Sequence, residues 1–235
     1  MRIKREDILY EDKEIIVCHK RAGAAVQTAR LGETDMETEL KKYFRMPYVA
    51  AVHRLDQPVE GVLVFARTKR AAGDLGRQSK GQTMNKQYYA VVLAEGAKTP
   101  EGKIILADDL ERDGKSNVSR VVEKGKGKRA ELSYEIIERR KEEEEGLETA
   151  LARIWLKTGR HHQIRVQMAH AGMPLLGDVK YGNEKSISYS RRKGIKYTAL
   201  CAYRLEFCHP VTGKEMRFDI VPSEKAFLPF LPVNT

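Results

Sequence analysis

The sequence predicts an α+β fold with a largely antiparallel sheet. Short apolar stretches of strand length outnumber helical patterns along the chain. Two pairs of these stretches are joined by connections typical of hairpins, RRKEEEEG at 139–146 and HPVTG at 209–213. No internal repeat and no Pro- or Ser-rich linker interrupts the chain, so we expect a single domain over residues 1–235.

Three helices are expected. Thr34-Asp35-Met36-Glu37 has the form of a capping box, and apolar residues at helical spacing follow it. A second helix is expected over residues 69–78. A third begins near His161 and ends at Gly172, with Pro174 just beyond it.

The strands are expected in chain order at residues 48–55, 61–66, 87–93, 130–138, 149–157, 200–208 and 215–221. The strand at 87–93 contains two adjacent tyrosines, Tyr88 and Tyr89, which period-2 geometry directs to opposite faces. One of them therefore points inward, where a satisfied core hydroxyl is the ordinary reading and a chemical role the alternative. The basic run at 124–129, KGKGKR, is most simply a solvated loop.

Composition narrows the classes of protein. The chain has 43 Lys and Arg against 33 Asp and Glu, a formal net charge of +10, which favours a polyanionic partner or else serves only as a solubilising surface. Three Cys without CxxC or zinc-ligand spacing argue against a disulfide framework or a structural metal. The sequence has no signal-peptide core and no apolar run of membrane-spanning length, so we expect a cytoplasmic protein.

Two charged residues stand where charge is costly. In AVHRLDQPVEGVLVFAR, Asp56 ends one expected strand and begins a turn before an apolar one. Arg165 shares a helical face with Met168 and Ala169, so it points partly toward the core. Each charge needs a partner. Asp56 either caps its own turn or pairs with Arg165, and that pair is either functional or purely structural.

Several motifs together resemble the RluA family of RNA pseudouridine synthases in order and spacing. They are HRLD at 53–56, KQYYA at 86–90, TGRHHQIRVQ at 158–167, PLLGDVKYG at 174–182 and LEFCHPVTGKEMRF at 205–218. The resemblance extends from about residue 12 to residue 222. It implies one catalytic domain on a long mixed, mainly antiparallel sheet, an RNA-binding cleft across its middle, and no cofactor or metal.

The resemblance also implies roles for individual residues. Asp56 is the catalytic residue, Tyr88 packs against the target base, and Arg165 pairs with the catalytic carboxylate and keeps it charged. Arg54 resembles the residue that fills the space left by an extruded base. The remaining RNA contacts implied by the motifs are His53, Lys86, Arg160, His162 and Gln163.

The implied reaction converts uridine to pseudouridine. It breaks the N1–C1′ bond, turns the uracil, and rejoins it through C5 after the base has left its stack. Asp56 either attacks C1′ or assists removal of a ribose proton to give a glycal, and the sequence does not choose between these routes. Departures from the family pattern, at Pro58 to Gly61, His161 and Lys20 to Gly23, remove no catalytic group but affect the expected RNA target.

Other classes of protein would need residues or motifs that differ from those found here. A glycosidase needs two carboxylates, and the motifs contain one; a DNA-binding protein would show a helix-turn-helix or a zinc finger. A family member that binds RNA without activity is the remaining alternative. We expect ribosomal or transfer RNA as the partner, no membrane, no obligate protein partner, a monomer, and no small S4-type domain in front.

Overall fold

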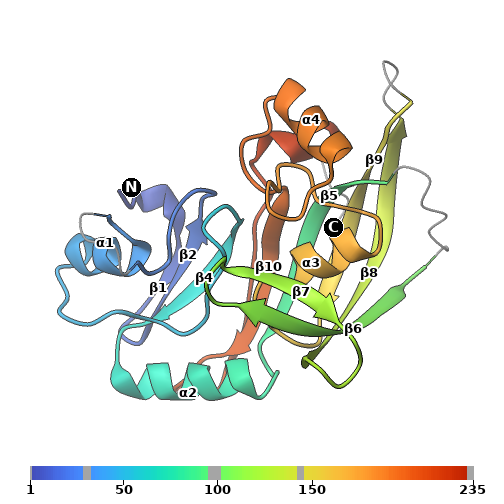
Figure 1. Ribbon diagram of the computed structural model, residues 1–235. Coiled ribbons are helices and arrows are strands. Elements are labelled where there is room, and N and C mark those ends of the chain that lie inside the picture. Colours follow the sequence, from blue (N-terminus) through green and yellow to red (C-terminus); the bar gives the residue numbers. More distant parts are fainter. Residues whose placement is uncertain (1, 29–32, 95–101, 142–145, 232–235) are drawn as a thin grey trace. The chain divides into compact units, whose positions relative to one another are not determined.

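The structure is a computed structural model that describes residues 2–28, 33–94, 102–141 and 146–231. The chain divides into two compact units, one comprising residues 1–86 and 202–221 and the other residues 87–201 and 222–235. Figure 1 shows strands and a few helices in each unit, which confirms the α+β class. Two of the three boundaries fall inside strands, β5 (Asn85–Leu93) and β10 (Leu200–Cys208), and the third follows β11.

The first unit contains one run of paired strands with a helix on each face. Its strand order is β1-β2-β4-β10, with β11 paired to β10 and β3 to β4. The bounds are η1 Arg5–Asp7, β1 Ile8–Glu11, β2 Ile15–Lys20, α1 Met36–Tyr43, β3 Ala50–Ala51, β4 Glu60–Ala66, α2 Lys69–Lys80 and β11 Glu215–Asp219.

Strand β4 divides the core of this unit into two layers because its side chains alternate. Leu63 and Phe65 pack with Met36 and Leu40 of α1. On the opposite face, Val62, Val64 and Ala66 pack in the cluster that contains Ala71 and Leu75 of α2. Both faces of β4 are therefore buried, which explains its uninterrupted apolar sequence.

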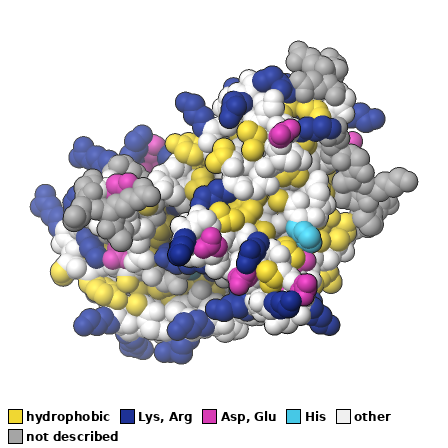
Figure 2. Space-filling model, in the orientation of Figure 1, with side chains coloured by type: hydrophobic (Ala, Val, Ile, Leu, Met, Phe, Trp, Pro, Cys, Tyr) yellow, Lys and Arg dark blue, Asp and Glu magenta, His cyan; other side chains and the backbone are white. Residues whose placement is uncertain are grey.

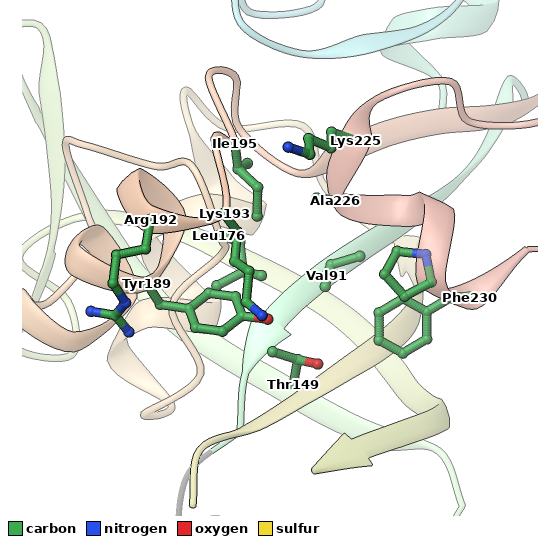
Figure 3. A pocket seen from close by; sticks show the side chains of 11 residues that line it. Val91, Thr149, Leu176, Tyr189, Arg192, Lys193, Ile195, Lys225, Ala226 and Phe230 are labelled. Carbon is green, nitrogen blue, oxygen red and sulfur yellow. The ribbon is translucent and has the colours of Figure 1, made fainter. Parts of the chain in front are cut away.

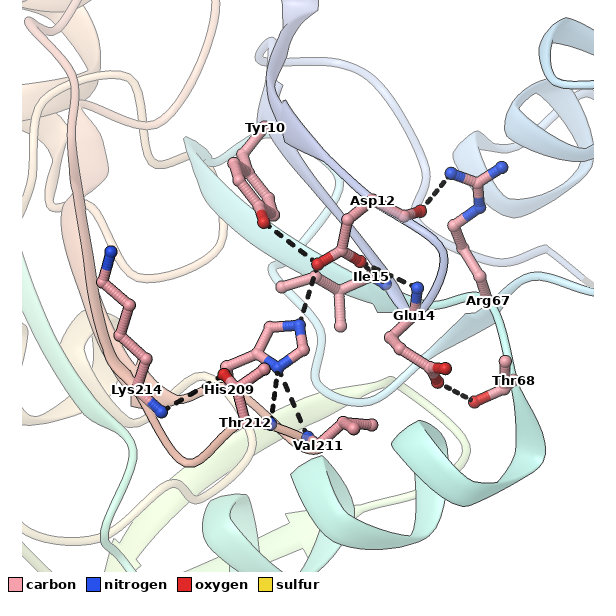
Figure 4. Close-up of polar contacts among 10 residues, drawn as sticks. All are labelled: Tyr10, Asp12, Glu14, Ile15, Arg67, Thr68, His209, Val211, Thr212 and Lys214. Carbon is pink, nitrogen blue, oxygen red and sulfur yellow. Dashed lines mark hydrogen bonds and ion pairs between the residues drawn. The ribbon is translucent and has the colours of Figure 1, made fainter.

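A carboxylate ties the β1–β2 turn to the β10–β11 hairpin (Figure 4). Asp12 accepts hydrogen bonds from Glu14 N at 2.7 Å and Ile15 N at 2.9 Å. His209 Nδ1 accepts from Thr212 N at 3.1 Å, so Nε2 carries the proton and donates to Asp12 at 2.9 Å. Burial raises the pKa of Asp12, but these hydrogen bonds outweigh it and the net shift is downward.

The second unit is an antiparallel run in the order β5-β9-β8-β6-β7. Its further elements are β6 Ile104–Asp113, β7 Val118–Val122, β8 Lys128–Lys141, β9 Glu148–Leu156, α3 Gln163–His170, α4 Glu184–Arg192 and η2 Lys225–Phe230. Val166 of α3 packs against Leu110 of β6 and Ala130 of β8. Helix α3 is buried at six consecutive positions, 163 to 168.

Most expected elements are confirmed, and two expectations are wrong. The strand expected at 48–55 is reduced to β3, because the chain bends at Val52 and His53. The His53 ring then accepts from Val64 N at 3.4 Å, a position that a neighbouring strand would otherwise occupy. Helix α1 is capped by Asp35 through Thr38 N at 2.8 Å, one residue later than the capping box predicted.

Both predicted hairpins form. Strands β8 and β9 pair antiparallel, as do β10 and β11; residues 142–145 of the first connection lie outside the described residues. Lys and Arg side chains are spread widely over the face shown in Figure 2. Among the described helices, none has the length and apolar character needed to cross a membrane.

Candidate active site

Asp56 lies in the turn between β3 and β4, and its side chain is half-buried. Val59 N donates to the Asp56 carbonyl at 3.0 Å, which closes the turn. Gly61 follows it in β4, where an added Cβ would come within 2.5 Å of the Ala202 Cβ. The glycine therefore allows β4 to lie close to β10 directly after the turn.

Lys20, the last residue of β2, holds this turn in place. Its side chain is completely buried, and Nζ donates to the carbonyls of Gln57 at 3.0 Å and Val59 at 2.5 Å. Gly23 N also donates to the Gln57 carbonyl, at 2.8 Å. Burying an ammonium without acceptors costs several kcal/mol, so Lys20 can be buried only because these carbonyls accept its hydrogen bonds. They fix the backbone that carries Asp56.

The two residues before Leu55 are placed very differently. His53 is buried. Its burial is the main cause that lowers the pKa of His53 well below 6.5, and the positive charge of Lys86 is the second. Arg54 is exposed and has no ion-pair partner among the described residues. Glu60, a carboxylate six residues further along the chain, is completely buried with Oε1 2.7 Å from His19 Nε2. Arg54 is thus available for an external contact.

Strand β5 carries Lys86 and the two tyrosines. Burial lowers the pKa of Lys86 to about 8. Tyr88 and Tyr89 are both buried, so the side chains on both faces of this part of β5 are covered. Tyr89 pairs in register with Arg153 of β9, whose guanidinium carbon lies 5.9 Å from the tyrosine ring centroid. The side chain of Arg153 thus helps to cover the face on which Tyr89 lies.

Arg165 on α3 makes a buried, bidentate ion pair with Asp178. Arg165 Nε lies 2.6 Å from Oδ2 and Nη2 lies 2.7 Å from Oδ1. Asp178 Oδ1 also accepts from the backbone N of Lys180 and Tyr181, at 3.0 and 3.3 Å. The Arg165 guanidinium carbon lies 5.1 Å from the Tyr181 ring centroid. Two parallel bonds and a ring fix the plane of the guanidinium.

The start of α3 is anchored to β7 and Tyr181. The Tyr181 hydroxyl accepts from Ser119 N at 2.8 Å and lies 2.8 Å from His162 Nδ1. His161 stacks on His162 with ring centroids 3.7 Å apart, and its Nδ1 lies 2.9 Å from Ser119 Oγ. His162 has a left-handed backbone, φ 53°, directly before the first helical residue. This network sets the position from which α3 begins.

The other predicted RNA contacts near α3 divide into buried and exposed ones. Gln163 is buried, accepts from Thr158 Oγ1 at 2.8 Å and Arg160 N at 2.9 Å, and donates to the Glu131 carbonyl at 3.1 Å. Arg160 is exposed and donates from Nε to the Arg129 carbonyl at 2.9 Å. His162 and Gln163 therefore organise the loop before α3, and their contact with RNA stays a prediction.

The predicted site residues fall in both units. His53, Arg54, Asp56 and Lys86 belong to the first, and Tyr88, Arg160, His162, Gln163 and Arg165 to the second. The structure adds three residues that sequence reasoning did not assign to the site, namely Lys20, Asp178 and Tyr181. The latter two stand in the PLLGDVKYG motif, so the signal was present. In the part of the chain that is described, no three His, Cys, Asp or Glu residues are grouped to hold a metal ion.

Comparison with solved structures shows the fold. Human RNA Pseudouridylate Synthase Domain Containing 1 superimposes with a TM-score of 0.74 at 22% identity, covering 98% of this chain and 89% of that one. Human RNA Pseudouridylate Synthase Domain Containing 4 gives a TM-score of 0.69 at 19% identity, with 94% and 92% covered. The α+β open sheet is therefore that of pseudouridylate synthase domains.

Comparison with sequences shows the family. Ribosomal large subunit pseudouridine synthase D of Xanthomonas campestris is 36% identical over 225 residues, 90% of this chain and 64% of the relative. Dual-specificity RNA pseudouridine synthase RluA of Vibrio parahaemolyticus is 33% identical over 206 residues, 87% and 78% respectively. The chain thus spans less than two thirds of the Xanthomonas protein. Residues 14–170 match the family described as RNA pseudouridylate synthase, and the chain belongs to this family.

Proposed function

We propose that the protein is an RNA pseudouridine synthase that isomerises specific uridines to pseudouridine. The observation that carries the proposal is the family match over residues 14–170, which includes Asp56, Tyr88 and Arg165 in their motifs. The rigid turn around Asp56 and the fixed plane of Arg165 support it. Such preorganisation is what a catalytic carboxylate and its cationic partner require.

The proposed mechanism assigns one task to each of three residues. Asp56 attacks C1′, or assists removal of a ribose proton to give a glycal, as the N1–C1′ bond breaks. Tyr88 packs against the uracil and helps to remove the proton from C5 once the C5–C1′ bond has formed. Arg165 pairs with Asp56 and offsets its negative charge in the site. Arg54 fills the space that the extruded uridine leaves.

Ribosomal RNA is the proposed substrate class, with transfer RNA second. The Xanthomonas relative is named for the large ribosomal subunit, and the Vibrio relative is named dual-specificity. The net charge of +10 suits a phosphate backbone. We further propose that the protein is cytoplasmic, works without a cofactor and is a monomer. Light scattering of the purified protein would test its oligomeric state.

Tritium release from RNA labelled at C5 of uridine tests the activity, because C5 loses its proton only when pseudouridine forms. The purified protein is incubated with unmodified ribosomal and transfer RNA transcripts under single-turnover conditions. We expect release with wild type and none with Asp56→Asn, which keeps the shape of the side chain and removes its charge. RNA affinity should be retained in the variant.

Two outcomes would count against the proposal. Release by Asp56→Asn at a tenth of the wild-type rate or more would show that Asp56 is not the catalytic group. No release by wild type on any transcript, with tight RNA binding, would favour the alternative of an RNA-binding family member without activity.

A further inference from the structure

The second unit contains a hollow that the proposed mechanism does not use (Figure 3). Its volume is about 320 Å³. Residues at the end of α4 stand on one side and residues of η2 on the other, with Val91 of β5 and Thr149 of β9 between them. The lining comprises Val91, Thr149, Leu176, Tyr189, Arg192, Lys193, Ile195, Lys225, Ala226, Pro229 and Phe230.

The hollow has an apolar interior and a cationic rim. Val91, Leu176 and Phe230 are buried side chains that form its floor and wall. Arg192, Lys193 and Lys225 are exposed, and the lining contains no Asp or Glu. An apolar recess edged by cations fits a ligand that has a flat apolar part and a negative charge.

Helix chemistry does not account for the whole rim. Arg192 and Lys193 lie at the C-terminus of α4, where cations interact favourably with the helix dipole. Lys225 comes from η2, a separate segment, and is the first residue of that helix, where a cation gains nothing from the dipole. It nevertheless lines the same hollow. Cations from two separate segments therefore converge on the same hollow.

We propose that this hollow binds one unstacked nucleotide of the RNA substrate, at a position other than the target uridine. The base enters the recess beside Tyr189 and Phe230, and the adjoining phosphate lies between Arg192, Lys193 and Lys225. The volume lies at the low end for ligand sites, which suits a single nucleotide. The inference rests on the proposed function only in taking RNA as the partner.

Phosphate contact is tested by salt-dependent binding. The variant Arg192→Ala/Lys193→Ala/Lys225→Ala is compared with Lys69→Ala/Arg70→Ala/Lys80→Ala, which removes three exposed cations from α2 and changes net charge equally. Affinity for a labelled single-stranded oligouridylate is measured by anisotropy across a salt series. We expect the hollow variant to lose affinity on the order of tenfold more than the control, and its salt slope to fall by about 2.

Occupancy of the recess is tested without changing charge. Ile195→Trp fills the hollow, and we expect weaker RNA binding with an unchanged salt slope. Thermal melts check that each variant is folded. If the triple hollow variant is not, Lys225→Glu, at an exposed position, replaces it and should weaken binding in the same way.

Three results would overturn the inference. Equal affinity losses in the two triple variants would show only an effect of net charge. Full RNA affinity in folded Ile195→Trp would show that no base enters. Binding of free AMP that shifts the signals of Tyr189, with RNA affinity unchanged in the hollow variants, would assign the site to a small nucleotide. Tritium release by wild type is scored separately, so the proposed activity and this site can fail independently.

Discussion

The ion pair between Arg165 and Asp178 leads to a quantitative prediction for Asp178→Asn. In the wild type, four N–H groups donate hydrogen bonds to the Asp178 carboxylate. They are Nε and Nη2 of Arg165 and the backbone N–H groups of Lys180 and Tyr181. Asparagine keeps one acceptor oxygen and replaces the other by an amide nitrogen that faces N–H donors. The substitution also removes the negative charge that lies against the buried guanidinium. Removing one partner of such a pair costs about 3 kcal/mol or more.

This loss of free energy of unfolding is large enough to measure in a melt. For a chain of this length, 1 kcal/mol shifts Tm by about 2–4 °C, so about 3 kcal/mol predicts a drop of roughly 6–12 °C. The matched control is Glu111→Gln, which removes the carboxylate that Arg120 binds through Nε at 2.9 Å and Nη2 at 2.6 Å. That pair is exposed, 73% at Arg120 and 46% at Glu111, so the control should shift Tm by less than about 3 °C.

A second variant separates stability from positioning. In Arg165→Met/Asp178→Leu both charges are replaced by apolar groups, a change that often restores or raises the stability of a buried pair. We expect Tm to recover toward wild type, whereas tritium release should be absent because the double variant lacks Arg165. A Tm for Asp178→Asn within about 2 °C of wild type would refute the reasoning. Recovery of activity in the double variant would refute a functional role for Arg165.

Three further predictions concern Arg54, His53 and metals. Arg54→Ala should slow modification of a uridine in a stacked stem far more than of one in a flexible strand, where less flipping energy is needed; equal losses on both would reject the flipping role. The pKa of His53 is lower in the folded protein than the ordinary 6.5, so the unfolded chain protonates first and stability falls as pH drops below about 6.5. Urea titrations should show wild type losing about 1.4 kcal/mol per pH unit there relative to His53→Gln, and parallel curves would contradict this. EDTA should leave tritium release unchanged, because His161 and His162 are adjacent rather than at helical ligand spacing; recovery of a lost rate by a divalent metal, with RNA folding unaffected, would show otherwise.

The sequence predicted the elements whose pattern is local. Strands β5, β9 and β10 were expected within a residue or two because apolar alternation is visible in a short window. Strand β6 was missed because its sequence, IILADDLERD, is charged, and only pairing with β8 and β7 on either side makes it a strand. That pairing depends on residues distant in the chain, which a local pattern does not reveal.

The same distinction between local patterns and contacts with other parts of the chain applies to the candidate site. Asp56 and Arg165 could be chosen from the sequence because a charged residue beside an apolar stretch needs a partner. The motifs then indicated a role for each of them. The sequence alone suggests Asp56 as the partner of Arg165. Asp178 was not predicted as a partner, although it lies only thirteen residues further along the chain. Helix periodicity gives the direction of a side chain but not which residue of the following loop returns to it.

Lys20 illustrates why residues that position a site are harder to predict than residues that react. A lysine at the end of an apolar strand is ordinarily exposed, and its sequence, VCHKRAG, contains no acidic residue to suggest a partner. Its partners include the carbonyls of Arg21, Gln57 and Val59. Every residue has a carbonyl, so no side-chain pattern could indicate these partners. The choice of lysine is nevertheless physical. Its compact ammonium on a flexible stem can donate to several carbonyls at once, whereas the planar guanidinium of arginine directs its donors in a fixed fork. The geometry of the Asp56 turn thus depends on the type of residue at position 20.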